Sequence, residues 1–243
     1  MVQQLLLKSQ FQAVLKNYRP SDSAIEKLSK TKIALFNGPT ASGRNTIMER
    51  LVATQKYQQI VSDTTRHPRE NNGVLEQSGV EYWFKTEEEL LAGLKAGKYI
   101  EAAIIHDQQV SGVSVKEIER AAEQHKIAVN DIQPEGVEAF KMYKSDTICI
   151  FVIPPDIKTW LARLSRRGGM SAVERERRIA SCQTELEHAL SADYYHFVIN
   201  NNLEDVVSEV DSICQHPELH TTSAKTSRVA NTLLDDVRVY LSK

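Results

Sequence analysis

The sequence predicts an α/β fold in which a parallel sheet is flanked by helices, and two observations carry this prediction. The first is a buried-strand pattern, KIALF (Lys32 to Phe36), followed at once by a glycine-rich loop and by helical spacing of apolar residues at Ile47 and Leu51. The second is a series of strand-like runs with helical patterns between most of them: YQQIVS, EYWF, YIEAAII, KIAVNDI, TICIFVI and HFVIN. Such alternation is typical of a parallel sheet with helical crossovers.

Helical patterns also flank this region at both ends. Residues 2–30 have helical spacing in two pieces broken at Pro20, with Ser21 and Ser23 as candidate caps. Residues 216–226 are polar and are predicted to be a linker. The amphipathic stripe beyond it predicts a terminal helix with apolar positions Val229, Leu233, Leu234, Val237 and Leu241. We expect these terminal helices to pack on the core or on a second subunit, so a homo-oligomer formed through them is an expectation.

Composition limits the classes of partner. The chain has 30 Lys and Arg residues against 32 Asp and Glu residues. Its net charge is therefore close to zero and produces no overall positive field that would attract nucleic acid or an anionic membrane. Cys149, Cys182 and Cys214 are odd in number and far apart, as expected of reduced, mostly buried cysteines. No apolar run approaches the roughly 20 residues of a membrane helix. We therefore expect a cytoplasmic protein with no nucleic-acid or membrane partner.

The glycine-rich stretch GPTASGRNT follows the first predicted strand and resembles a phosphate-binding loop. That loop has the pattern G-x-x-x-x-G-K-[ST], in which the Lys reaches the β- and γ-phosphates and the hydroxyl binds Mg²⁺. Gly38 and Gly43 have the required spacing, but Arg44 and Asn45 replace the Lys and the hydroxyl residue. An ordinary strand-to-helix turn is the alternative for two glycines five residues apart.

A second candidate site is the segment SDTTRHPR, which places Ser62, Arg66 and Arg69 directly after a predicted strand. Guanidinium groups are planar forks of donors that match phosphate oxygens two at a time, so the two arginines are candidates for a phosphate clamp. A solvated basic turn is the alternative.

A dense cationic segment follows later in the chain. RLSRRGG (Arg163 to Gly169) and ERERR (Glu174 to Arg178) lie around a double glycine. Mobile arginines that close over a transferring phosphoryl group stabilise its charge. The alternative is a charged helix surface with i,i+4 pairs such as Glu174 with Arg178.

Two acidic residues at strand termini are further candidates. Asp131 ends the KIAVNDI strand, where an acid can hold Mg²⁺ directly or through water. Glu101 opens the EAAII run, where its carboxylate could accept hydrogen bonds from a base. An ordinary turn residue and a rim charge are the respective alternatives.

These motifs, in this order, resemble the guanylate kinase family over about residues 32–215. The most specific match is VSDTTRHPR, supported by NDIQPEGV, IPP, RLSRRG, RRIASCQTEL and VINNNL. The resemblance implies a P-loop NMP-kinase-type parallel sheet flanked by helices, with an NMP-binding region at about 62–114 and a lid at about 167–178. Residues 1–31 would then be an N-terminal helical extension, and residues 216–243 a linker and a C-terminal helix.

The resemblance also implies site residues and substrates. ATP with Mg²⁺ and a nucleoside monophosphate would be bound, and Arg44, Arg167 and Arg178 would act on the donor phosphates. The loop residues at the ATP phosphates would be Gly38, Ser42, Gly43, Asn45 and Thr46, with Asn200 near the adenine. The acceptor set would be Ser62, Arg66, Arg69, Tyr82, Glu101, Ser111 and Gln133, and Asp131 would be the metal candidate.

Departures from the family pattern leave three hypotheses open. Besides Arg44 and Asn45, the family's Y-G-[ST] becomes Ser111-Gly112-Val113, its second Asp becomes Gln133, and the segment ENNGVLEQSGVE is longer than expected. The first hypothesis is a kinase that transfers the ATP γ-phosphoryl group to GMP or a related acceptor. The second is a catalytically impaired binding or scaffold module, and the third is a kinase for a different phosphorylated acceptor.

Overall fold

The computed structural model describes residues 4–71, 73–105, 107–166 and 171–242. The chain divides into two compact units. The loop unit comprises residues 33–57, 129–137 and 147–243, and the clamp unit comprises residues 1–32, 58–128 and 138–146. The glycine-rich loop lies in the loop unit, whereas Arg66 and Arg69 lie in the clamp unit.

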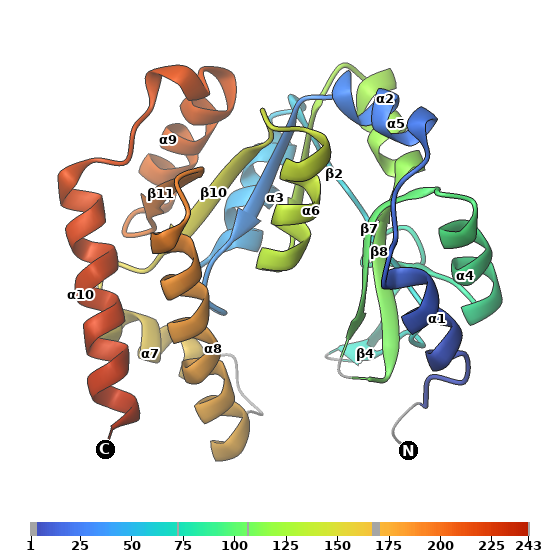
Figure 1. Ribbon diagram of the computed structural model, residues 1–243. Coiled ribbons are helices and arrows are strands. Elements are labelled where there is room, and N and C mark those ends of the chain that lie inside the picture. The colour runs from blue at the N-terminus through green and yellow to red at the C-terminus, as the bar shows by residue number, and fades with distance from the viewer. Residues whose placement is uncertain (1–3, 72, 106, 167–170, 243) are drawn as a thin grey trace. The chain divides into compact units, whose positions relative to one another are not determined.

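A parallel sheet forms the centre of the loop unit (Figure 1). Strands β1 (Ile33–Asn37), β10 (Ile148–Ile153) and β11 (Tyr195–Ile199) pair in parallel. All residues of β1 and β10 are buried, which explains their unbroken apolar runs. The full strand order is β11-β10-β1-β9-β2, where β9 is Ile127–Asp131 and β2 is Tyr57–Gln59. The predicted parallel sheet is confirmed.

Helices follow the strands of the loop unit. They are α3 (Arg44–Ala53), the start of α6 (Pro134–Tyr143), α7 (Ile157–Arg166), α8 (Ala172–Ser191), α9 (Leu203–Gln215), the 3-10 turn η1 (Pro217–Leu219) and α10 (Ala224–Leu241). The terminal helix α10 lies along α8 (Figure 1), and Arg238 Nη2 is 2.9 Å from Glu187 Oε1 of that helix. Its predicted stripe is largely buried at Leu233, Leu234 and Val237. Helix α10 therefore packs its apolar face against the rest of the loop unit.

The clamp unit is built on a four-stranded sheet of order β6-β3-β8-β7. The strands are β3 (Asp63–Thr64), β6 (Trp83–Phe84), β7 (Tyr99–Ile105) and β8 (Gln109–Ser114), beside a small hairpin of β4 (Glu70–Asn71) and β5 (Val74–Leu75). The run YIEAAII forms β7, but it pairs antiparallel with β8 and so lies outside the parallel sheet. Strand β8 has the sequence QVSGVS, whose weak apolar alternation gave no strand signal.

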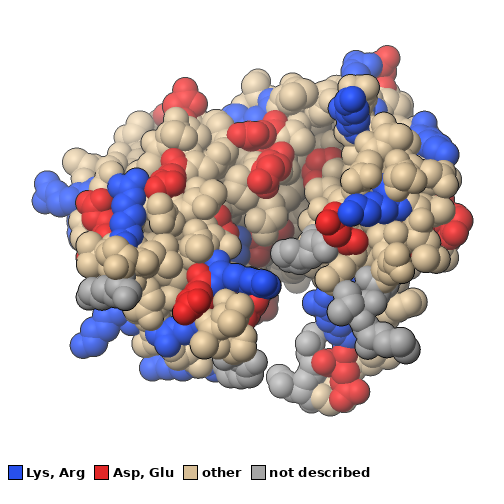
Figure 2. Space-filling model, turned by 60° about the horizontal axis from the view of Figure 1, so that its bottom comes forward, with Lys and Arg blue, Asp and Glu red and all other residues tan. Residues whose placement is uncertain are grey.

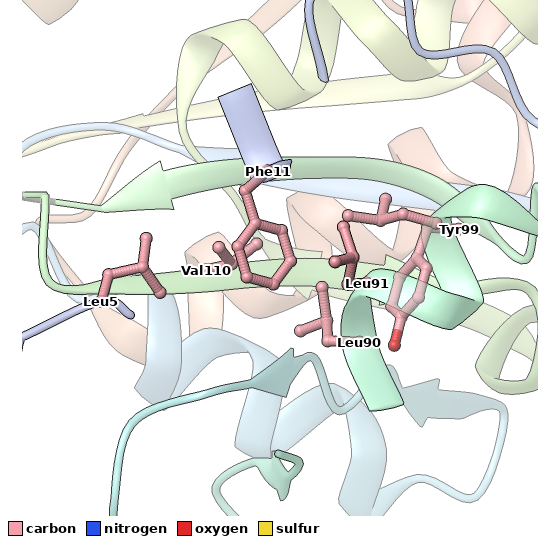
Figure 3. Packing of buried hydrophobic residues seen from close by; sticks show 7 residues of the cluster. Leu5, Phe11, Leu90, Leu91, Tyr99 and Val110 are labelled. Atoms are coloured by element: carbon pink, nitrogen blue, oxygen red, sulfur yellow. The ribbon is translucent and has the colours of Figure 1, made fainter. Parts of the chain in front are cut away.

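The clamp unit also contains α1 (Lys8–Leu15), α2 (Asp22–Ser29), α4 (Glu87–Lys95), α5 (Val115–Glu123) and the end of α6. As predicted, the N-terminal segment is helical in two pieces, and Ser21 caps the second by accepting from the Ala24 N–H at 3.2 Å. Phe11 of α1 points into the apolar core beside Leu91 and Val110 (Figure 3). Helix α1 therefore shares a hydrophobic core with α4, β7 and β8.

Charged side chains of both signs lie at the surface, as the composition indicates (Figure 2). On the face shown in Figure 2, Lys and Arg side chains are mixed with Asp and Glu rather than gathered by sign. In the described ranges, no helix combines the length and the apolar character needed to cross a membrane. The three cysteines are buried, as expected.

Candidate functional site

The glycine-rich loop joins β1 to the N-terminus of α3, as the sequence predicted. Gly38 has φ of +134°, and a Cβ atom there would lie 2.3 Å from the Val152 carbonyl oxygen. Gly43 caps α3 in a left-handed conformation with φ of +102°. Both positions therefore require glycine, because a side chain would clash or be strained. The loop presents the N-terminal end of α3, where backbone N–H groups favour an anion.

Asn200 fixes the loop from the end of β11. Its Nδ2 donates to the Ser42 carbonyl at 2.7 Å, and the side chain is buried. A Cβ atom on Gly43 would come within 2.1 Å of this nitrogen. The residue expected near adenine is thus in direct contact with the glycine-rich loop, and its amide holds that loop in shape.

A pocket of about 410 Å³ lies beside the loop and is large enough for part of a nucleotide. Its lining is Ala41, Gly43, Arg44, Asn45, Thr46, Arg163, Asn200, Asn201 and Leu203. Arg163 of α7 donates from Nη2 to the Asn200 carbonyl at 2.9 Å, and its buried Nη1 has no hydrogen-bond partner in the described part of the chain. An unpaired buried cationic donor at the pocket wall favours an anionic ligand. Arg163 was not among the predicted site residues.

Arg44 forms an ion pair with Asp131 within the loop unit. Arg44 Nη1 is 2.6 Å from Asp131 Oδ1, and their side chains are 15% and 30% exposed. Charge-assisted contacts of this kind at partly buried sites are strong and directional. The structure therefore joins two predicted site residues to each other: the guanidinium at the Lys position and the acid at the end of β9.

A third ionisable group, Glu185 of α8, lies close to this pair. Burial raises the pKa of the Glu185 carboxyl to about 7, against the lowering effect of Arg44 and, more weakly, Arg178. One of its oxygens, Oε2, is buried without a hydrogen-bond partner among the described residues. Sequence reasoning missed Glu185, although it lies two helical turns after Arg178 and so on the same face of the helix.

The tip of the loop is held by α7 and α8. Trp160 donates from Nε1 to the Thr40 carbonyl at 2.8 Å, and Arg178 donates from Nη1 to Thr40 Oγ1 at 3.1 Å. Arg178 also pairs with Glu174 at 2.7 Å, which is the i,i+4 contact of the alternative interpretation. The structure thus brings Arg178 to the loop, while Arg167 lies outside the described residues.

In the clamp unit, Arg66 is buried and paired with Glu76 rather than exposed. Its Nη1 and Nη2 donate to the two carboxylate oxygens of Glu76 at 2.5 and 2.9 Å. The Tyr82 ring lies against the guanidinium, with 4.7 Å between the ring centroid and Cζ. Arg69 is exposed and Ser62 half-buried. Glu76 was not among the predicted site residues, although it belongs to the segment that is longer than the family pattern.

Glu101 and Ser111 lie on adjacent strands of the same sheet. Glu101 pairs with Val113, and Ser111 pairs with Ala103, so both side chains project from one face. Desolvation raises the pKa of Glu101 to about 7, although a hydrogen bond from the Val113 backbone lowers it. Ser111 donates from Oγ to Thr64 Oγ1 at 3.0 Å. Gln133 is exposed and lies in the loop unit, between β9 and α6.

A sequence model described as guanylate kinase matches residues 30–217. The chain belongs to the guanylate kinase family. This finding confirms the resemblance carried by the loop and by the arginine segment.

Individual family members resemble the chain over most of their length. It is 28% identical to the guanylate kinase of Rickettsia bellii over 186 residues, covering 76% of this chain and 94% of that protein. It is 27% identical to the guanylate kinase of Porphyromonas gingivalis, covering 74% and 94%. The crystal structure of guanylate kinase from Anaplasma phagocytophilum superposes with a TM-score of 0.56 at 23% identity, covering 79% of this chain and 89% of that one. The last similarity shows the fold alone.

Relative to the matched region, this guanylate kinase family member carries additional helices at both ends. Helices α1 and α2 precede residue 30, and α10 follows residue 217. Both additions contribute buried side chains to their own unit, as at Phe11 and Leu233.

Proposed function

We propose that this protein is a nucleoside monophosphate kinase of the guanylate kinase type, which transfers the γ-phosphoryl group of ATP to GMP or a related acceptor. The observation that carries the proposal is the loop itself. Gly38 and Gly43 allow a backbone turn that no other residue type fits well, and this turn leads into the N-terminus of α3 beside the 410 Å³ pocket. The relatives named guanylate kinase support the same reaction class.

The transfer would be a single displacement. An oxygen of the acceptor phosphate attacks the γ-phosphorus, the bond from that phosphorus to the oxygen bridging the β-phosphate breaks, and ADP leaves. Arg66 and Arg69 would hold the acceptor phosphate, and Arg178 would approach the donor phosphates. Catalysis would then consist of positioning and charge stabilisation.

The residues at the loop are compatible with a Mg²⁺ ion that binds together with ATP. Where the chain is described, no group of three or more His, Cys, Asp or Glu side chains could bind a metal alone. Mg²⁺ in kinases is held mainly by substrate phosphates and water, with one or two protein carboxylates. Asp131, directly or through water, and the Asn45 amide oxygen would be its protein contacts. When bound, Mg²⁺ neutralises charge that develops on the β- and γ-phosphate oxygens.

The Arg44–Asp131 ion pair favours a second candidate function, an impaired binding module. A guanidinium held 2.6 Å from a carboxylate is drawn away from a donor phosphate, and the same contact occupies an oxygen of the metal candidate. Under this alternative the acceptor still binds but no transfer follows. The Ser111–Thr64 hydrogen bond favours the third candidate, a different phosphorylated acceptor, because this hydroxyl already has a partner within the sheet.

The test is ADP release from ATP and Mg²⁺, with GMP, dGMP, AMP, CMP, UMP and IMP offered separately and binding of each measured in parallel. Stimulation by one nucleotide supports the kinase and identifies its acceptor. Binding without stimulation supports the binding module. Absence of both would overturn the proposal. Arg66→Ala should weaken binding of the acceptor, because it removes one of the two guanidinium groups proposed to hold the acceptor phosphate.

A further inference from the structure

A second pocket, of about 740 Å³, lies in the clamp unit beside helices α2, α4 and α5. Its volume is within the range of pockets that bind small organic molecules. The residues that border it come from the start of α2, the end of α4, the start of α5 and the strands β3, β6 and β7. Among the described residues that border it, none belongs to the sets assigned above to ATP or to the acceptor.

The pocket lies on the face of the clamp sheet opposite to the predicted acceptor residues. Asp63 borders the pocket, whereas the next residue, Thr64, is hydrogen-bonded to Ser111. Because successive side chains of a strand point to opposite faces, Asp63 and Ser111 belong to different faces of the sheet. Trp83, which pairs with Asp63 between β3 and β6, also borders the pocket. The pocket is therefore separate from the site that the proposed function uses for the acceptor.

Helix α2, which precedes the matched guanylate kinase region, closes one side of the pocket. The Ser21 N–H donates to the Gly97 carbonyl at 3.0 Å, which joins the start of α2 to the turn after α4. Lys27 Nζ lies 2.5 Å from Glu119 Oε1, which joins α2 to α5, and the two helices lie side by side (Figure 1). The pocket thus depends on the additional N-terminal segment of this chain.

The inner wall of the pocket combines an aromatic ring with a buried carboxyl group. Trp83 is half-buried and is held by its Nε1, which donates to Glu117 Oε1 at 2.9 Å. Asp63 is 5% exposed, and its Oδ2 accepts from the Tyr99 hydroxyl at 2.6 Å. Within residues 4–71, 73–105, 107–166 and 171–242, its Oδ1 has no hydrogen-bond partner. This wall fits a planar ring that carries an N–H donor, because the ring packs on Trp83 and the donor compensates the desolvated oxygen.

Lysine side chains border the same pocket. As far as the structure describes the chain, no carboxylate forms an ion pair with Lys85, Lys98 or Lys116. Lys116 Nζ lies 5.8 Å from the centroid of the Trp83 ring, so this ammonium group is adjacent to the aromatic wall. Glu89 also borders the pocket, and its carboxylate accepts at 2.9 Å from the N–H at the start of its own helix. The three ammonium groups favour an anionic group on the ligand.

We propose that this pocket binds a heteroaromatic anion, a planar ring with an N–H donor that is joined to a phosphate or carboxylate group. The ring packs against Trp83, and its N–H donates to Asp63. The anionic group lies near Lys85, Lys98 and Lys116. The inference goes beyond the proposed function and does not depend on it, because the pocket and the acceptor residues lie on opposite faces of the sheet.

Isothermal titration calorimetry of the full chain with matched probes tests the proposal. Indole-3-acetate and indoxyl phosphate carry the same N–H ring with a carboxylate or a phosphate group, so they identify which anion the lysines accept. Indole-3-acetamide lacks the charge, and 1-methylindole-3-acetate lacks the N–H. We expect both anions to bind, and the amide and the methylated acid to bind roughly tenfold more weakly than indole-3-acetate. This is the lower end of the effect of losing one hydrogen bond to a charged group.

Variants of the chain show where the probes bind. Ala92→Phe fills the pocket from α4 and should abolish binding of both anions, whereas Ala13→Phe, at an exposed alanine of α1 that does not border the pocket, is the matched control. Lys85→Gln should weaken binding of the anions about tenfold and leave indole-3-acetamide unchanged, with Lys16→Gln as its control. If thermal unfolding shows that Ala92→Phe does not fold, Ala96→Phe at the end of the same helix replaces it.

Three results would overturn the inference. If the wild type binds neither indole-3-acetate nor indoxyl phosphate, the pocket is not a site for heteroaromatic anions. If a probe binds the pocket-filling variant as tightly as the wild type, its site lies elsewhere on the chain. If indole-3-acetamide binds as tightly as indole-3-acetate, the lysines have no part in recognition. Each result leaves the proposed kinase standing, because ADP release with GMP is measured separately.

Discussion

The Arg44 guanidinium lies against the Asp131 carboxylate, with 2.6 Å between Nη1 and Oδ1. The two residues are 87 positions apart, and both were predicted to act on the donor side. Their contact changes what each can do. Arg44 is charge-paired before any phosphate arrives, and Asp131 has an oxygen engaged before any metal arrives. Under the proposed function, donor binding would therefore compete with an internal ion pair.

Restoring the usual loop residues should relieve this competition. The double variant Arg44→Lys with Asn45→Ser provides a compact ammonium and a hydroxyl in place of the bulkier fork and the amide. We expect ADP release with GMP to rise by about a hundredfold, the lower end of the range associated with one well-placed donor at a transition state. Arg50→Lys on the exposed face of α3 is the control. A rate that stays the same or falls would show that the loop has adapted to Arg44.

Substituting alanine for a loop glycine should destabilise the protein far more than the same substitution at a glycine with no neighbouring atoms. Gly38→Ala places a Cβ atom 2.3 Å from a backbone carbonyl, whereas Gly73, also at positive φ, has no atom within 4 Å of such a Cβ. We expect Gly38→Ala to lower the free energy of unfolding by about 3 kcal/mol or more, and Gly73→Ala by about 1 kcal/mol. Urea unfolding measures both. If the two variants lost the same free energy of unfolding, the backbone at Val152 would be able to move away from the added Cβ atom.

Base recognition should depend on pH through Glu101. Guanine presents N–H donors on the edge that a carboxylate would accept, so binding requires ionised Glu101, whose pKa is raised to about 7 by burial. We expect guanosine affinity to fall by about tenfold as pH drops from 8 to 6, and Glu101→Gln to abolish this dependence. Guanosine is the ligand of choice because the phosphate of GMP titrates near pH 6. A flat wild-type profile would remove Glu101 from base recognition.

Glu185 should make the protein less stable as pH rises. Its pKa in the folded state is raised from 4.5 to about 7, so the native state binds more protons than the unfolded state between these values. Glu185→Gln should therefore stabilise the protein at pH 8 by about 1–3 kcal/mol relative to its effect at pH 4. Glu187→Gln, at a position of the same helix that is 41% exposed, should show no such gain. If Glu185→Gln changed the free energy of unfolding by the same amount at both pH values, burial would not raise the pKa of Glu185.

Features encoded locally were predicted well. The strand β1, the two loop glycines and the start of α3 follow one another in the chain, so spacing alone was enough to indicate the motif. The arginine segment after residue 62 was likewise recognised from its own sequence. The family resemblance extended this to Asn200 and Arg178, both of which contact the loop, although their roles toward ATP remain predictions.

Features that depend on distant contacts were not predicted. Glu76 and Glu185 have ordinary sequence surroundings, and their importance arises from burial next to Arg66 and near Arg44. The pairing of Arg44 with Asp131 could have been anticipated only by noting that parallel strands end at one edge of a sheet. Strand β8 was missed because its polar sequence is stabilised by pairing with β7 and β3 rather than by its own apolar pattern.

The central claim, phosphoryl transfer to a nucleoside monophosphate, is tested most directly by following the γ-phosphoryl group itself. ATP labelled at the γ-position is incubated with Mg²⁺, GMP and the protein, and the label is traced to its product. Our account predicts that the label enters GDP in equal amount to the ADP formed and that Arg66→Ala prevents this transfer. Label found only in ATP or in inorganic phosphate, while GMP remains bound, would contradict the kinase and establish the binding module instead.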